Sequence, residues 1–163
     1  CALPISDGSV TAATSSPLTD GASATLVTSE EYARANGLPI LARIKSIAVA
    51  GCAPEIMGIG PVNATIKALS RAGLSLADID IIELNEAFAA QGLASMRALG
   101  VADDDPRVNA QGGAIAIGHP LGMSGARLVM TAVYQLQRTQ GRYALCTMCV
   151  GVGQGVALIL ERV

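Results

Sequence analysis

Short apolar runs alternate with amphipathic stretches along most of this 163-residue chain. The apolar runs are rich in Val, Ile, Leu and Ala and are bounded by turn-forming residues, a pattern typical of buried β-strands. The last two runs are separated by a glycine run and form a strand pair. Five segments are therefore predicted to be strands: 22–28, 41–49, 79–84, 143–150 and 156–161.

Four amphipathic stretches are predicted to be helices. Ser29 is placed to cap the first of them, and Gly37 is placed to end it. Pro61 suits the first turn of the second helix, and Gly73 suits its end. The other two helices are expected over 86–99 and 124–140.

The order of these elements describes one layered α/β domain with a mixed sheet. Turn formers concentrate in 7–21 and 50–60, which predicts loops there, and 112–118 is a glycine-spaced apolar segment. We see no internal repeat.

Composition narrows the class of protein. Hydrophobic residues make up 51% of the chain and charged residues 15%, which indicates a core-rich globular domain. The net charge is −2 and the chain has no basic stripe, so its charge does not indicate binding to nucleic acid. No apolar run approaches the roughly 20 residues of a membrane span, and no secretory signal is visible. The first residue is Cys1, so we expect a processed chain or a piece of a longer one.

Four cysteines raise the question of disulfides, metal binding or redox chemistry. Cys146 and Cys149 form a C-x-x-C pair, but this pair ends an apolar run and does not open a helix. Cys1 and Cys52 do not supply the second closely spaced pair that a zinc site needs. We therefore expect no metal, mostly buried reduced thiols and a cytoplasmic location, with a zinc or redox module as the competing interpretation.

Two glycine-rich segments carry candidate chemistry. The only histidine lies in Gly-Gly-Ala-Ile-Ala-Ile-Gly-His119-Pro-Leu-Gly, and a cysteine opens Cys149-Val-Gly-Val-Gly-Gln-Gly. A lone histidine is often structural, and a cysteine is by default a core thiol. The glycines argue otherwise, because they allow a ligand to approach the backbone and a packed strand rarely needs three of them. An imidazole and a thiol are parts of an acyl-transfer site, and the backbone NH of Gly151 could bind an oxyanion.

Asn85 lies between a predicted strand and a predicted helix. One interpretation is a helix N-cap, a role that asparagine performs well. Another is an amide at the carboxyl edge of the sheet that holds a water or a carbonyl oxygen. The two roles are compatible.

These residues resemble one family, the thiolases or acetyl-CoA C-acyltransferases. The matching blocks are Val-Thr-Ala-Ala-Thr-Ser-Ser-Pro-Leu-Thr-Asp-Gly-Ala near the start, Asn85-Glu-Ala-Phe-Ala-Ala, and the two segments around His119 and Cys149. Their order and spacing cover essentially the whole chain. The stretch from Arg142 to Cys149 looks most like the β-ketoadipyl-CoA thiolase branch. The resemblance implies a layered domain with a mixed five-stranded sheet covered by helices on both faces.

The family implies thiolytic cleavage of a 3-oxoacyl-CoA by CoA, or the reverse Claisen condensation of acetyl-CoA. Cys149 would be the acid/base cysteine. His119 would activate the nucleophilic cysteine and form an oxyanion hole with a water held by Asn85, and the NH of Gly151 would serve a second oxyanion hole. Coenzyme A would be a substrate, with no covalently bound cofactor. The pantetheine and acyl pocket would be lined by Ala12, Ser16, Met57, Ala87 and Phe88.

The chain departs from the family pattern in an informative way. The acylated cysteine of the family has no counterpart here, because neither Cys1 nor Cys52 has its setting. Thr14 and Pro17 stand where Asn and Gly are commoner. We therefore expect residues 1–163 to be a C-terminal thiolase domain, inactive without its nucleophile-bearing N-terminal domain and part of a homodimer or homotetramer when intact.

Two other interpretations stay open. A decarboxylating ketoacyl synthase shares the fold but has no use for a second cysteine at position 149. A non-catalytic pairing or folding module would expose an apolar docking face and show no turnover.

Overall fold

A mixed four-stranded sheet organises the domain in the computed structural model, which describes residues 8–163. Along the sheet the strands follow the order β1-β4-β3-β2. Strand β4 pairs antiparallel with both β1 and β3, whereas β2 and β3 are parallel. The strands are β1 (Ala42–Gly51), β2 (Ile81–Leu84), β3 (Tyr143–Val150) and β4 (Gln154–Arg162).

The prediction of a fifth strand at 22–28 is wrong. This segment has no regular structure, and every residue in it is exposed, including Leu26 and Val27. Its branched and apolar composition favours a strand, but a strand also needs a neighbouring backbone to pair with. Within the described residues, 22–28 pairs with no strand of the sheet, and so its sequence preference is not realised.

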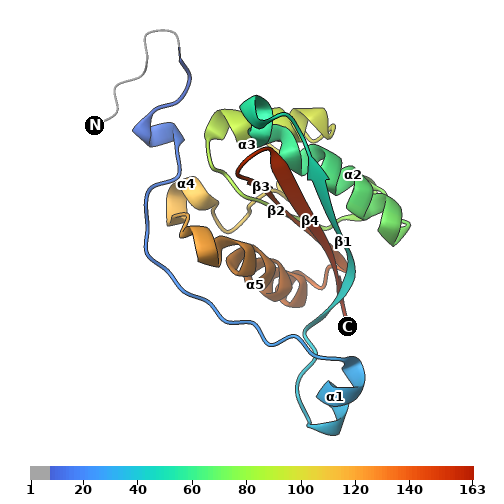
Figure 1. Cartoon of the computed structure of the whole chain (residues 1–163). Helices are drawn as coiled ribbons and strands as arrows, with labels where there is room; N and C mark the ends of the chain where they lie inside the picture. The colour runs from blue at the N-terminus through green and yellow to red at the C-terminus, as the bar shows by residue number, and fades with distance from the viewer. Residues whose placement is uncertain (1–7) are drawn as a thin grey trace.

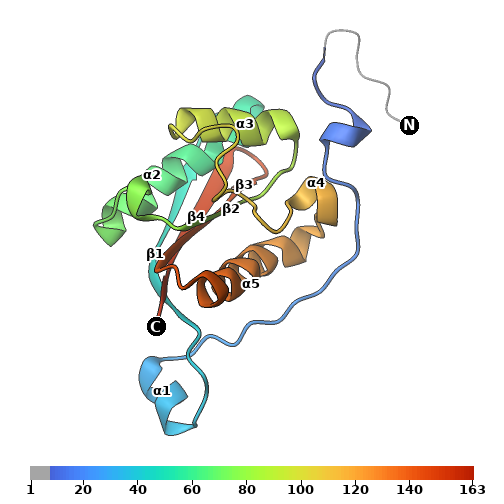
Figure 2. The same cartoon turned by 180° about the vertical axis from the view of Figure 1, so that it is seen from behind.

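Helices cover both faces of the sheet, as the resemblance implies. Figure 1 and Figure 2 show α2 (Gly60–Ala72) and α3 (Ala89–Ala98) on one side and α5 (Leu121–Thr139) on the other. Each face has its own core. One joins Ala64, Ala68 and Met96 to strand residues such as Leu145 and Ile159. The other joins α5 to the opposite strand faces through Leu128, Ala132, Leu136, Ala144 and Leu160.

Local sequence signals set most helix ends. The Ser29 hydroxyl accepts from the Tyr32 NH at the start of α1 (Glu30–Ala35), and Gly73 ends α2 in the left-handed conformation with φ of +68°. Helix α3 begins three residues later than expected, and α5 begins three residues earlier, directly after Pro120. Short helical segments fill the connections: η1 (Ala12–Thr14), η2 (Pro54–Ile59), η3 (Leu76–Asp78) and α4 (Ala114–Ile117).

The residues before β1 run outside the layered body. In Figure 2 this segment passes α4 and α5 and leads to α1, which stands apart from the sheet. An ion pair between Glu30 and Arg43, at 2.7 Å, ties α1 to the start of β1. No helix within residues 8–163 has the length and apolarity to cross a membrane.

Candidate active site

Two predicted site residues lie at one edge of the sheet because β2 and β3 are parallel. Asn85 directly follows β2, and its backbone NH donates to the carbonyl of Thr147 at 3.0 Å. Cys149 lies two residues further along β3. The carboxyl ends of parallel strands meet at one edge, which is where α/β proteins place ligands. The topology therefore brings Asn85 and Cys149 to the same edge.

The side chain of Asn85 points to His119. The Asn85 Nδ2 atom lies 3.3 Å from His119 Nε2, and Asn85 is fully buried. Its Oδ1 atom is also buried and has no hydrogen-bond partner. Such an unpaired buried acceptor marks a place for a water or a ligand donor. The N-cap of α3 is Phe88, so the interpretation of Asn85 as a helix N-cap is wrong.

His119 is held at both its backbone and its ring. Its backbone NH donates to Thr19 Oγ1 at 2.8 Å, and its Nδ1 atom lies 2.5 Å from Ser124 Oγ. Gly118 precedes it with φ of +100°, and a side chain there would collide with Thr19. Burial, with a smaller contribution from the charge of Arg127, lowers the pKa of His119. The ring is therefore neutral near pH 7, as a general base must be.

Glu86 anchors the loop that leads to His119. Its carboxylate accepts hydrogen bonds from Asn109 Nδ2 at 2.6 Å and from the Ile115 NH at 3.2 Å. Gly113 lies so close that any side chain there would overlap the Glu86 carboxylate. Asn109 also pairs through its amide with both backbone groups of Leu84. The residues beside Asn85 thus fix the segment that carries His119.

Cys149 lies on the face of β3 opposite to Cys146, because strand residues alternate. Burial is the main reason that the pKa of the Cys149 thiol is raised. The turn after it is joined to the segment that leads into η2, since the Cys52 NH donates to the Gly153 carbonyl at 2.8 Å. A side chain added at Gly151 would meet no atom within 4 Å, so the backbone there faces open space.

Only some of the expected pocket residues come together. The backbone NH of Ser16 donates to the Ala87 carbonyl at 3.0 Å, and Ser15 forms a bridge with Phe88. Met57 lies half-buried in η2. Ala12 lies exposed in η1, and no described contact joins it to the other four.

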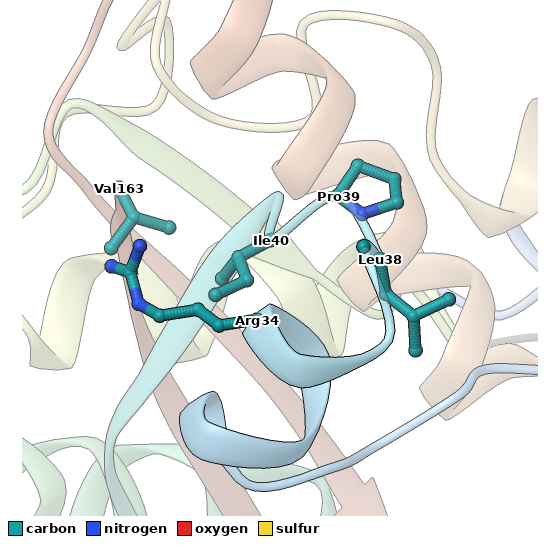
Figure 3. Close-up of a pocket in the computed structure, with 6 residues that line it drawn as sticks. Arg34, Leu38, Pro39, Ile40 and Val163 are labelled. Atoms are coloured by element: carbon teal, nitrogen blue, oxygen red, sulfur yellow. The ribbon is translucent and has the colours of Figure 1, made fainter.

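Surface hollows lie beside His119 and beside α1. One, of about 470 Å³, opens beside His119 and is lined by Leu18, Thr19, Asp20, His119 and Leu121. The larger, of about 590 Å³, lies between α1 and the end of β4, as Figure 3 shows. It is lined by Arg34, Gly37, Leu38, Pro39, Ile40 and Val163, and the Arg34 guanidinium already pairs with Glu30. The hollow at His119 is therefore the one with reactive groups.

Cys52, Cys146 and Cys149 are free thiols, and Cys1 lies outside the described residues. Within 8–163 no three His, Cys, Asp or Glu side chains gather as metal ligands.

Sequence reasoning missed four residues that position the site: Thr19, Glu86, Asn109 and Ser124. Glu86 directly follows Asn85, and its position in a motif was the one available signal. The other three act through contacts between distant segments or across a helix turn, which a linear pattern does not reveal.

Known proteins match both the sequence and the fold. The family described as the C-terminal domain of thiolase matches residues 38–162. The 3-oxoadipyl-CoA/3-oxo-5,6-dehydrosuberyl-CoA thiolase of Escherichia coli strain K12 is 60% identical over 157 residues, which is 96% of this chain and 39% of that protein. The β-ketoadipyl-CoA thiolase of Pseudomonas knackmussii is also 60% identical over the same shares. This chain thus spans about two fifths of the length of these relatives.

A solved structure adds the three-dimensional comparison. The crystal structure of human mitochondrial 3-ketoacyl-CoA thiolase in complex with CoA has a TM-score of 0.94 and 48% sequence identity. The match covers 98% of this chain and 40% of the human one. Sequence and fold agree, and the chain belongs to the thiolase family through its C-terminal domain.

Proposed function

We propose that this chain supplies one half of the active site of an acyltransferase. The reaction is cleavage of a 3-oxoacyl-CoA by CoA, or the reverse condensation of acetyl-CoA. The observation that carries the proposal is the direct contact of Asn85 with His119 at the sheet edge that also bears Cys149. The sequence similarity of the 142–149 stretch to the β-ketoadipyl-CoA branch favours 3-oxoadipyl-CoA as the substrate.

His119 acts as the first base. A neutral imidazole takes the proton of a nucleophilic cysteine, and that thiolate attacks the 3-oxo carbon of the substrate. The unpaired Oδ1 of Asn85 supports this step, since it can accept from a water whose second hydrogen points at the thioester oxygen. Asn85 thus holds the water, and the water and His119 stabilise the developing enolate.

Cys149 acts as acid and then as base. When the carbon–carbon bond breaks, its thiol gives its proton to the enolate carbon and releases acetyl-CoA. The resulting thiolate takes the proton of the incoming CoA thiol, and the CoA sulfur attacks the acyl-cysteine. The acyl-CoA product then leaves, and the released nucleophilic cysteine regains the proton that His119 took in the first step. The raised pKa keeps Cys149 protonated at neutral pH, which suits its first role. The NH of Gly151 then stabilises the oxyanion of the second attack.

The nucleophilic cysteine is proposed to come from a partner domain. Cys146 is fully enclosed in the core, and Cys52 sits beside Cys149 without an imidazole of its own. A domain that brings the nucleophile would also cover the apolar residues that this chain exposes. Acyl-CoA and CoA then bind between the two domains, against Ala12, Ser16, Met57, Ala87 and Phe88. We place the intact homo-oligomer in the cytoplasm.

A non-catalytic pairing module is the second candidate. It is favoured by the exposed apolar side chains Ile44, Ile47 and Val49 on β1, each at least half accessible. This candidate predicts binding of the partner domain without any requirement for Cys149 or His119.

A pair of cysteine variants tests the catalytic proposal. The chain is combined with the N-terminal part of the Escherichia coli relative, and thiolysis of acetoacetyl-CoA is measured. Cys149→Ala is expected to lower kcat by about 10²–10⁴-fold. Cys146→Ala, on the same strand but facing the other core, is the control and should retain activity. Equal activity of both variants would contradict the role of Cys149.

His119→Ala tests the first step separately. This variant should slow the formation of the acyl-enzyme, followed by rapid quench, because the nucleophile loses its base. A normal rate of acylation would remove His119 from that role.

A further inference from the structure

Two side chains contact the imidazole of His119, one at each ring nitrogen. Ser124 Oγ lies 2.5 Å from Nδ1, and Asn85 Nδ2 lies 3.3 Å from Nε2. A neutral imidazole carries one hydrogen, so one nitrogen donates and the other accepts. Which nitrogen carries the hydrogen decides whether the lone pair faces Asn85.

A second contact of the Ser124 hydroxyl indicates the direction of its hydrogen bond with His119. Its Oγ also lies 3.0 Å from the carbonyl oxygen of Pro120, one turn earlier in the chain. A carbonyl can only accept, so this contact directs the single hydrogen of the Ser124 hydroxyl to Pro120, whose carbonyl also accepts from the backbone NH groups of Met123 and Ser124. Toward His119 the serine oxygen can then only accept. Ser124 is fully buried, so bulk water does not compete for it.

We propose that Ser124 is a positioning residue that holds His119 with its hydrogen on Nδ1 and its lone pair on Nε2. The four groups then form a one-directional chain. The Asn85 amide donates to His119, His119 donates to Ser124, and Ser124 donates to Pro120. The orientation of the Asn85 amide follows, and its Oδ1 atom is left as the free acceptor.

This inference deepens the proposed function and rests on it for its catalytic meaning. With the lone pair on Nε2, the ring can take a proton there when a nucleophilic thiol replaces the Asn85 amide as the donor to Nε2. Without Ser124, the hydrogen could move to Nε2, and His119 would then present a donor in place of a base. The Asn85 amide would turn over to match, which would withdraw the free acceptor.

Because His119 is the only histidine, its nitrogen spectrum can be read without assignment. The full 163-residue chain is labelled with ¹⁵N-histidine and measured at pH 8, where the ring is neutral. We expect Nδ1 to give a pyrrole-type signal and Nε2 a pyridine-type signal. Ser124→Ala should move both signals toward each other, and Ser124→Thr, which keeps the hydroxyl, should restore the separation.

Ser95→Ala is the matched control. Ser95 is also fully buried in a helix and bonds to a carbonyl, that of Gly58 at 3.2 Å, but it does not contact His119. Its variant should leave the two nitrogen signals unchanged.

Two results would overturn the proposal: a pyrrole-type Nε2 in the unmodified chain, or signals that do not move in Ser124→Ala. If Ser124→Ala does not fold by circular dichroism, the unmodified chain still decides the first point. The spectrum requires no turnover. A hydrogen on Nδ1 together with failed thiolysis would therefore overturn the proposed function alone.

Discussion

The surroundings of His119 and Cys149 determine whether each side chain carries a proton. Burial acts on both: it favours the neutral imidazole and the neutral thiol. For His119 the result is a base, and for Cys149 it is an acid. One physical cause thus prepares two groups for opposite proton transfers.

The same burial predicts an order of thiol reactivity. The thiolate is the species that iodoacetamide alkylates, so a raised pKa slows labelling at neutral pH. Cys149, which is 8% exposed, should react slowly at pH 7 and faster as the pH rises through the range of ordinary cysteines and above it. Cys146, whose pKa is also raised by burial, should stay unlabelled while the chain is folded.

Mass spectrometry of the digested protein gives the extent of labelling at each cysteine. Labelling of Cys146 as fast as Cys149 in the folded chain would contradict this account of their surroundings.

Among the elements, β4 and the start of α2 approach each other unusually closely. Gly155 and Gly60 face each other there, and a side chain at either one would overlap the other's backbone. This contact allows the start of α2 to pack directly on β4. It also positions η2, which precedes α2, beside the turn that follows Cys149.

Gly155→Ala should therefore destabilise the fold by about 3 kcal/mol, since backbone atoms cannot move aside as a side chain can. Gly151→Ala, four residues earlier and in open space, should change the free energy of unfolding by less than about 1 kcal/mol. Urea unfolding measures both. Similar stability of the two variants would show that the contact between β4 and α2 can relax.

Strand β2 and helix α5 are joined by a buried polar group. Glu83 is fully buried, 3.3 Å from Arg127 and 2.8 Å from Gln135. Burial raises its pKa to about 7, against the opposing pull of Arg127. At pH values between the ordinary glutamate pKa and about 7, Glu83 is therefore protonated in the folded state and ionised in the unfolded state.

The stabilisation from this proton is complete below the ordinary glutamate pKa and is lost as the pH rises through about 7. The difference in unfolding free energy between the unmodified chain and Glu83→Gln should fall by up to about 3 kcal/mol from pH 5 to pH 8. Glu161→Gln is the control, because Arg142 lowers the pKa of Glu161 and its effect should stay flat over this range. A flat difference for Glu83→Gln would contradict the raised pKa.

The elements also show how far the sequence could be interpreted. Strand β3 has the bounds that were expected, because turn-forming residues on either side of its apolar run mark both ends in the local sequence. Ser29 and Gly73 act as expected for the same reason. The segment 22–28 fails because pairing depends on residues distant in sequence, and the contacts of Ser124 and Glu86 could not be predicted because they join separate segments.

At the scale of the whole molecule, large apolar side chains of β1 and α5 are exposed to solvent. Ile47 and Val49 are 54% and 52% exposed on the face of β1 that points away from α2. Met130 and Tyr134, one turn apart on α5, are also exposed. Exposed large apolar side chains of this kind are typical of a region that another protein surface covers.

This surface predicts self-association of the isolated chain. In sedimentation velocity the sedimentation coefficient should rise with concentration, and Ile47→Thr with Val49→Thr should reduce that rise. Ile66→Thr is the control, because Ile66 is equally exposed but lies on α2, over the other face of the sheet. A chain that stays monomeric at its highest soluble concentration would contradict the prediction.

The central claim is that these residues carry half of a thiolase site. The most direct test is thiolysis of acetoacetyl-CoA and 3-oxoadipyl-CoA, first by the chain alone and then with the N-terminal part of the Escherichia coli relative added. We predict no turnover by the chain alone and turnover once the nucleophile-bearing part is present, faster with 3-oxoadipyl-CoA. Turnover by the chain alone would contradict the claim, because a nucleophile would then have to lie within these 163 residues.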